Sequence, residues 1–250
     1  RNTDSTFPQI LSRTFNPSIT GQSVSFTFDE DVSSSLNASS LSITFVDPAL
    51  MSYSYVNNVA TWTFPGYGGV LPSHFYNATL SGAADSFGNP ATGANTWNFF
   101  WVTGDSGNNT FSISRSPSQT FLEVFVNGAG TPTYQAKVSA VQQFNLNACG
   151  GDDVIIVDHV RGGRPPIPVS AYNTFDGGSG SDTLRILGAP TAAETFVFAN
   201  GSYTSGGVST PYAGTEFVEF DDDGSGDSIT VNGGPRVTLL GTQRLSGLSI

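Results

Sequence analysis

The tetrapeptide Gly104-Asp105-Ser106-Gly107 has the sequence that surrounds a serine nucleophile in chymotrypsin-like proteases. That chemistry requires a histidine base and an aspartate that orients it. The chain has two histidines, His74 in LPSHFYN and His159 in VDHVRGG, and neither segment matches the histidine motif of those proteases. Asn108 also stands where a glycine is expected, and no Gly-x-Ser-x-Gly sequence occurs. We therefore expect Ser106 to lie in a turn, and we predict no catalytic residue.

His159 is the other residue that could do acid–base or metal chemistry. It follows Asp158 directly and lies close in sequence to Asp152 and Asp153. Strand alternation would place Asp158 and His159 on opposite faces, which favours a hydrogen-bonded or solvent-facing histidine. Cys149 is the only cysteine, so an intramolecular disulfide and a thiolate zinc site are both excluded.

The acidic segment EFDDDGSGDSI is the strongest candidate for a ligand site in the sequence. Asp221, Asp222, Asp223 and Asp227 supply carboxylate oxygens, the ligands that Ca²⁺ prefers. Their spacing is not that of an EF-hand loop, because the closing glutamate is missing. We predict a Ca²⁺ site here, and the alternative is a solvated acidic turn whose aspartates cap the backbone.

Composition narrows the class of protein. Nine Lys and Arg stand against 20 Asp and Glu in 250 residues, for a net charge of −11. Nucleic-acid and anionic-lipid binding both need basic residues, so neither is expected. No apolar run approaches the roughly 20 residues that a membrane helix needs. A chain rich in Ser, Thr, Gly and Asn with one lysine, Lys137, indicates a secreted protein, and we expect its signal peptide to have been removed.

The first hundred residues alternate with the period of half-buried strands. In SVSFTF, Val24, Phe26 and Phe28 share one face, and Asn57-Asn58 marks a hairpin turn in SYSYVNNVATWTF. Six or seven such strands predict a β-sandwich over residues 1–103. The segments GQSVSFTFDEDVSSSLNASSLSITF and YNATLSGAADSFGNPATG resemble bacterial Ig-like domains of surface-layer and other secreted proteins. That resemblance implies a spacer or adhesive module.

The remaining residues, 104–250, contain recurring glycine-rich corners followed by an alternating strand. The corner-ending residues Asn109, Asp153, Asp182 and Asp227 are 44, 29 and 45 residues apart. Residues 177–185, GGSGSDTLR, resemble the G-G-x-G-x-D-x-U-x nonapeptide of calcium-binding β-roll proteins, which implies Asp182 as a further Ca²⁺ ligand. No two copies are consecutive, as they are in that family. We expect an all-β chain in which this part is β-solenoid-like, with a second β-sandwich as the alternative.

These observations favour a non-enzymatic structural or adhesive protein of the cell surface or extracellular matrix. Its expected partners are copies of itself or other surface and matrix components, joined when a terminal segment adds a strand to a neighbour's sheet. The alternative that both terminal segments pair within their own domains stays open. A second hypothesis is a carbohydrate-binding or accessory module of a secreted hydrolase, with Trp62, Trp97 and Trp101 as the stacking residues. A third is an enzyme whose residues meet only in the fold.

Overall fold

The computed structural model describes residues 4–168, 171–221, 226–233, 236–241, 245 and 247–249. The chain is all-β, as expected, and its sheets are open. It divides into two compact units, Arg1–Trp101 (unit 1) and Val102–Ile250 (unit 2). Among the described residues, no helix has the length and apolar character required to span a bilayer.

Unit 1 contains two antiparallel sheets. One has the strand order β1-β2-β5-β4, and the other contains β3, β6 and β7. The strands are β1 (Ile10–Asn16), β2 (Ser23–Phe28), β3 (Leu41–Ile43), β4 (Ser52–Val56), β5 (Val59–Thr63), β6 (His74–Leu80) and β7 (Thr96–Thr103), whose last two residues belong to unit 2. Four short 3₁₀ turns link them: η1 (Ser33–Ser35), η2 (Ala38–Ser40), η3 (Pro48–Leu50) and η4 (Pro65–Tyr67).

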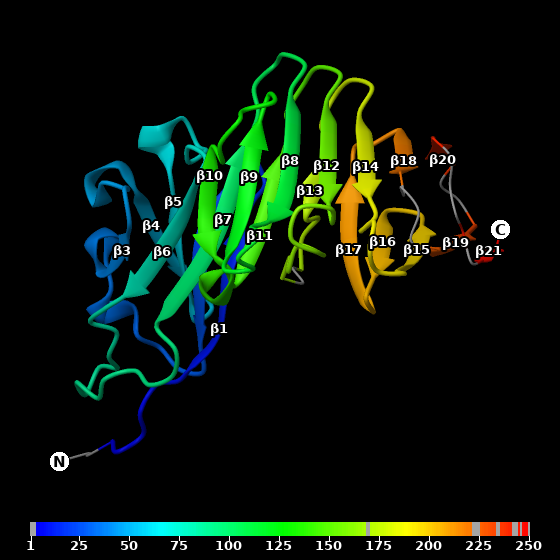
Figure 1. Ribbon diagram of the computed structural model, residues 1–250. Helices are drawn as coiled ribbons and strands as arrows, with labels where there is room; N and C mark the ends of the chain where they lie inside the picture. Colours follow the sequence, from blue (N-terminus) through cyan, green and yellow to red (C-terminus); the bar gives the residue numbers. More distant parts are fainter. Residues whose placement is uncertain are drawn as a thin grey trace. The chain divides into compact units, whose positions relative to one another are not determined.

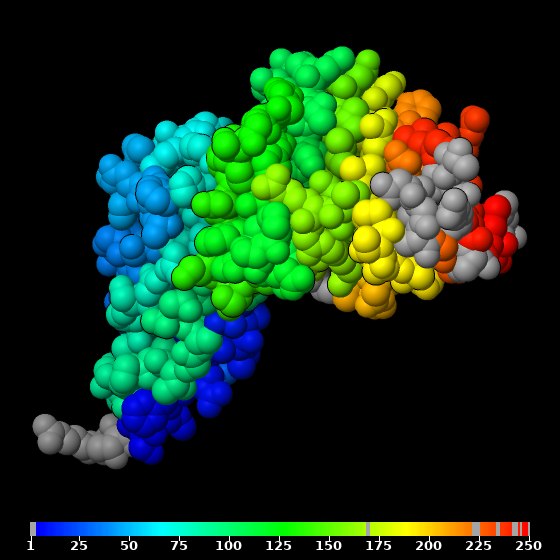
Figure 2. Space-filling view, viewed as in Figure 1, coloured from blue at the N-terminus to red at the C-terminus, as the bar shows by residue number. Residues whose placement is uncertain are grey.

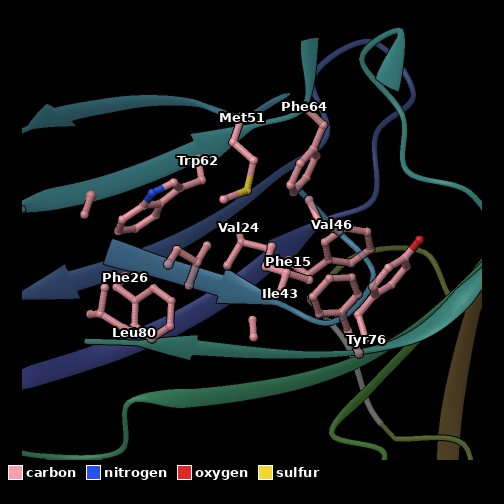
Figure 3. Packing of buried hydrophobic residues seen from close by; sticks show 14 of the residues in the cluster. Phe15, Val24, Phe26, Ile43, Val46, Met51, Trp62, Phe64, Tyr76 and Leu80 are labelled. Atoms are coloured by element: carbon pink, nitrogen blue, oxygen red, sulfur yellow. The ribbon is translucent and has the colours of Figure 1, made fainter. Parts of the chain in front are cut away.

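The core of unit 1 is built from the inward residues of these alternating strands. Val24, Phe26 and Trp62 are completely buried, and Figure 3 shows them packed together with Phe15 and Phe64. The predicted hairpin between β4 and β5 is confirmed. Its two central asparagines have φ of 51° and 61°, the left-handed values that a two-residue type I′ turn requires.

Unit 2 contains two mixed sheets. The first has the order β10-β9-β8-β12-β14-β18-β20, and the second contains β21-β19-β15-β16-β17-β13-β11. The strands are β8 (Thr110–Arg115), β9 (Phe121–Val126), β10 (Tyr134–Lys137), β11 (Gln143–Asn147), β12 (Val154–Asp158), β13 (Phe175–Asp176), β14 (Thr183–Leu187), β15 (Thr195–Ala199), β16 (Ser202–Ser205), β17 (Val208–Ala213), β18 (Phe217–Asp221), β19 (Ser228–Asn232), β20 (Val237–Leu240) and β21 (Gly247–Ser249), with one 3₁₀ turn, η5 (Val138–Ala140).

The parallel strands of unit 2 follow one another in sequence order. β8, β12, β14, β18 and β20 are each paired in parallel with the next (Figure 1). The chain enters β12, β14 and β18 directly from a strand of the other sheet, β11, β13 and β17, through a short corner. In the space-filling view, the green, yellow-green and yellow segments of unit 2 accordingly form successive bands (Figure 2).

Because the parallel strands of unit 2 pair in register, apolar side chains at equivalent positions form continuous rows across the sheet. Phe111, Ile155, Leu184 and Val218 occupy equivalent positions on four successive strands, and all four are buried. Two features depart from this plan. β9 and β10 extend the first sheet with antiparallel pairing beside β8, and β15-β16-β17 forms an antiparallel meander within the second sheet.

The contribution of the buried apolar row to stability can be tested by substitution. Ile155→Ala removes a completely buried side chain from the middle of the row, so it should lower the free energy of unfolding by about 2–5 kcal/mol. Ile156→Ala, on the other and half-buried face of the same strand, is the matched control and should cost clearly less. Urea unfolding followed by circular dichroism measures both, and equal losses would contradict the burial pattern.

Candidate functional site

Three of the four predicted corner residues, Asn109, Asp153 and Asp182, meet at one end of the parallel strands of unit 2, whereas Asp227 lies elsewhere. The backbone N–H of Asn109 donates to Oδ1 of Asp153 (2.6 Å), and the N–H of Asp153 donates to Oδ1 of Asp182 (2.8 Å). The N–H of Asp182 then donates to Oε2 of Glu216 (2.7 Å). We call Asn109, Asp153, Asp182 and Glu216 the corner ladder. Its corners lie side by side at the upper ends of β8, β12 and β14 in Figure 1.

A second ladder of neighbouring residues runs in the opposite direction. The N–H of Asp152 donates to Oδ1 of Asn108 (2.8 Å), and the N–H of Ser181 donates to Oδ1 of Asp152 (3.0 Å). Ser106 is exposed in the first of these corners, and the nearest acidic side chain in sequence, Asp105, accepts from the N–H of Gly107. The Gly-Asp-Ser-Gly sequence therefore forms one of the stacked corners, in agreement with the predicted turn.

Close stacking explains the glycines of the corners. Gly180 has φ of 140°, and a Cβ there would collide with the carbonyl oxygen of Gly151 in the preceding corner. A Cβ on Gly177 would collide in the same way with the carbonyl oxygen of Gly214. The glycines of the nonapeptide pattern thus allow neighbouring corners to pack closely. Oδ1 of Asp182 accepts a hydrogen bond from the backbone N–H of Asp153.

The inner carboxylates of the ladder are strongly buried. Asp153 is 1% exposed and Asp182 is 0% exposed. In each, Oδ2 is buried and has no hydrogen-bond partner among the described residues. Burial raises the pKa of both carboxyl groups, the backbone N–H bond each accepts partly opposes that rise, and neighbouring acidic side chains add to it.

The predicted Ca²⁺ ligands are spread over different parts of unit 2. Asp182 lies in the corner ladder, whereas Asp227 is buried just before β19, where its Oδ1 accepts from the N–H of Glu194 (2.7 Å). Asp221 ends β18. Asp222 and Asp223 lie outside the described residues, so the calcium assignment stays a prediction.

His159 forms a buried hydrogen bond to Glu194 that the sequence did not reveal. Its Nδ1 lies 2.8 Å from Oε1 of Glu194, and its side chain is completely buried. Burial acts to raise the pKa of the Glu194 carboxyl, but the hydrogen bond and charge of His159 hold it below its ordinary value. Nε2 is buried without a hydrogen-bond partner in the described part of the chain, and the Phe196 ring lies 5.5 Å from the imidazole. The pair is placed to hold β12 to the segment before β15.

Unit 1 brings together three other carboxylates, Asp4, Glu30 and Asp85. One oxygen of each lies within 4.8 Å of the others, and this is the one group of three potential metal ligands in the described residues. Burial, and then Asp29, Asp4 and Asp85, raise the pKa of Glu30. The sequence held a signal for this group, because the F-x-F-D-E strand and the D-x-x-G-N turn supply Glu30 and Asp85. Oxygen ligands of this kind suit a hard divalent cation such as Ca²⁺.

The tryptophans offer little surface for a sugar ring. Trp62 and Trp101 are completely buried, and their indole N–H groups donate to the carbonyl oxygens of Ala38 (3.1 Å) and Leu71 (2.9 Å). Trp97 is half-buried, with the Arg13 guanidinium 5.3 Å from its ring. Two of the three predicted stacking residues are therefore core residues.

Repulsion within the acidic group of unit 1 can be tested. Because the folded-state pKa of Glu30 is raised, its ionisation opposes folding at neutral pH and has no effect well below pH 4. Glu30→Gln should raise the thermal midpoint at pH 7 and leave it unchanged at pH 3.5. Millimolar Ca²⁺ should stabilise the wild type more than Glu30→Gln, with Asp221→Asn as the control that keeps the full calcium effect. The opposite ranking of these two variants would place the ion at the Asp221 segment.

Comparison with known proteins adds no relative to this description. A scan of the chain against protein-family models found no match, and a search of the curated proteins found none either.

Proposed function

We propose that this chain is a non-enzymatic structural or adhesive protein of the cell surface or extracellular matrix. In this proposal, residues 1–103 form an Ig-like β-sandwich that acts as a spacer, and residues 104–250 form a β-solenoid-like domain. The observation that carries the proposal is the in-register stack of five parallel strands, β8, β12, β14, β18 and β20, with its ladder of corner hydrogen bonds.

A stack of this kind suits a mechanical role. Each repeat contacts mainly its neighbours, so the structure grows along one direction and gains stability from each interface. The side chains best able to do chemistry are engaged in holding that stack. Asp153 and Asp182 accept backbone N–H groups, and His159 is bonded to Glu194. The acidic, lysine-poor composition supports an extracellular location.

Self-assembly would use sheet edges. The segments that we considered as strand donors pair within their own units, β1 with β2, β20 with β18 and β21 with β19. These terminal strands are therefore already hydrogen-bonded within their own units, and only the unpaired edges of the sheets are left to bind another copy. In the part of the chain that the structure describes, β20 and β21 are the last strands of their sheets, and Leu239 and Leu248 are exposed there. An open edge accepts a strand from another copy.

Electron microscopy of the purified protein tests the assembly. We expect regular fibres from the wild type and dispersed particles from Leu239→Lys, because a charge on the edge strand disfavours strand addition. Val160→Lys introduces the same charge at another exposed apolar residue of unit 2, one that is not on β20, and should leave the fibres intact. Dispersed wild-type particles at high concentration, with and without Ca²⁺, would overturn self-assembly.

One observation favours glycan binding as a second candidate. Phe45 is 73% exposed and has φ of 65°. It occupies the third position of a turn closed by the N–H of Val46 and the carbonyl of Ile43, where glycine is normally required. Its ring lies 4.1 Å from that of His74. Strained, exposed residues cluster at binding sites, and a flat ring of this kind suits the apolar face of a sugar.

The role of Phe45 is separable from folding. Phe45→Gly removes the left-handed strain, so it should leave stability unchanged or raise it by up to about 1 kcal/mol. If Phe45 binds glycans, the same variant should lose the signal of the wild type on a glycan array. Phe87→Gly, which removes another exposed phenylalanine of unit 1, should keep that signal. A stable Phe45→Gly protein with unchanged glycan binding would remove the support for this candidate.

A further inference from the structure

Three asparagines of the chain, Asn127, Asn200 and Asn232, are followed directly by glycine. Such a pair can react with itself, because the backbone nitrogen of the glycine can attack the side-chain carbonyl carbon of the asparagine. Glycine favours this attack, since it has no Cβ to block the approach and its backbone turns freely. The reaction needs only water, so the local structure determines which of the three asparagines can react.

Asn200 and Gly201 form the two-residue turn between β15 and β16. Ala199 and Ser202 are the last paired residues of the two strands, so the turn lies outside the ladder. Asn200 is exposed, and its side chain makes no hydrogen bond or ion pair within the described residues. Gly201 has φ of 72°, and its carbonyl oxygen accepts the N–H of Tyr212 (2.9 Å). The N–H of Gly201 itself is not hydrogen-bonded in the described part of the chain, so both reacting groups are available.

Asn127 is also exposed, but its side chain is held by a neighbouring strand. Its Oδ1 accepts the N–H of Thr110 (2.8 Å), and its own N–H donates to the carbonyl oxygen of Thr110 (2.7 Å). Rotation of the side-chain amide toward Gly128 breaks the first of these bonds. The loss of one such hydrogen bond is enough to slow the reaction by about fivefold.

Asn232 is restrained through its backbone. It is the last residue of β19 and is paired in parallel with Ala199 of β15. Attack on its side chain requires a rotation of its own backbone, and pairing within a sheet opposes such local opening. Asn200, in the turn that follows Ala199, has neither of these restraints within the described residues.

We propose that Asn200 is a site of spontaneous deamidation in the folded protein. The Gly201 nitrogen gives its proton to hydroxide and forms a bond to Cγ of Asn200, and the side-chain nitrogen takes a proton from water and leaves as ammonia. Water then opens the cyclic imide at either of its carbonyl groups and yields aspartate or isoaspartate. This modification site goes beyond the structural or adhesive role and does not depend on it.

Deamidation alters the turn in two ways. Either product adds a negative charge to a chain whose net charge is already −11. Isoaspartate also routes the main chain through Cβ, which lengthens a two-residue turn whose geometry sets the register of the hairpin. The strands that this turn joins carry Phe196, Phe198 and Tyr203, which are all buried. We therefore expect the isoaspartate form to unfold at a lower urea concentration than Asn200→Asp, which has the charge without the longer main chain.

Peptide mapping of the intact protein by mass spectrometry tests the proposal. Incubation in mildly alkaline buffer made with heavy-oxygen water labels every product that forms during the incubation. In the folded protein, Asn200 should react at least about fivefold faster than Asn127, and faster than Asn232. In urea, where the folded structure is lost, the three asparagines should react at similar rates.

Matched variants assign the signal to the turn. Asn200→Gln should abolish the reaction there, because the longer side chain of glutamine closes the imide ring much more slowly. Asn127→Gln makes the same change at the restrained asparagine and should leave the reaction of Asn200 unchanged.

Two results from the wild-type protein would overturn the proposal, and neither needs a variant to fold. One is an Asn200 side chain that keeps its amide in the folded protein and reacts only in urea. The other is reaction of Asn127 or Asn232 in the folded protein as fast as that of Asn200, since the turn would then give no advantage.

Discussion

The structure of unit 2 depends on the hydrogen bonds that pass from the backbone of one corner to the side chain of the next. A parallel strand pair has no tight hairpin to fix its register, and a slip of one residue would turn the row of Phe111, Ile155 and Leu184 out of the core. The bonds from Asn109 to Asp153 and from Asp153 to Asp182 fix that register at the start of each strand. Apolar burial then stabilises an alignment that polar groups have specified.

In unit 1 as well, hydrogen bonds to the backbone position residues of the hydrophobic core. The indole N–H of Trp62 is bonded to backbone at η2, and that of Trp101 to the segment before β6. Both rings are completely buried, so each N–H would be costly without its partner. In both units, several side chains that first suggest ligand binding, namely Asp153, Asp182 and Trp62, form hydrogen bonds to backbone groups.

The turns and strand alternation could be predicted from the sequence, whereas side-chain contacts between residues far apart in the chain could not. Alternation and turn chemistry predicted the hairpin at Asn57-Asn58 and the corners that end at Asn109, Asp153 and Asp182. The fourth corner differs, because Glu216 occupies the next rung and Asp227 bonds to the segment that precedes β15. Glu216 follows a single glycine, Gly214, and so lacks the repeated glycines of the pattern. The pairing of His159 with Glu194, 35 residues away, leaves no trace in either local segment.

The unequal distances between the rungs have a consequence for how such a chain can change. The ladder residues are 44, 29 and 34 residues apart, yet their strands stack in the same register. The spacing of the corners in the stack does not depend on the number of residues between them, because the segments between β8 and β11, between β12 and β13 and between β14 and β17 differ in length. These segments therefore differ in length from one repeat to the next while the stack keeps its register. β15 and β16 lie in the segment between β14 and β17, and there the added length forms two further strands of the second sheet.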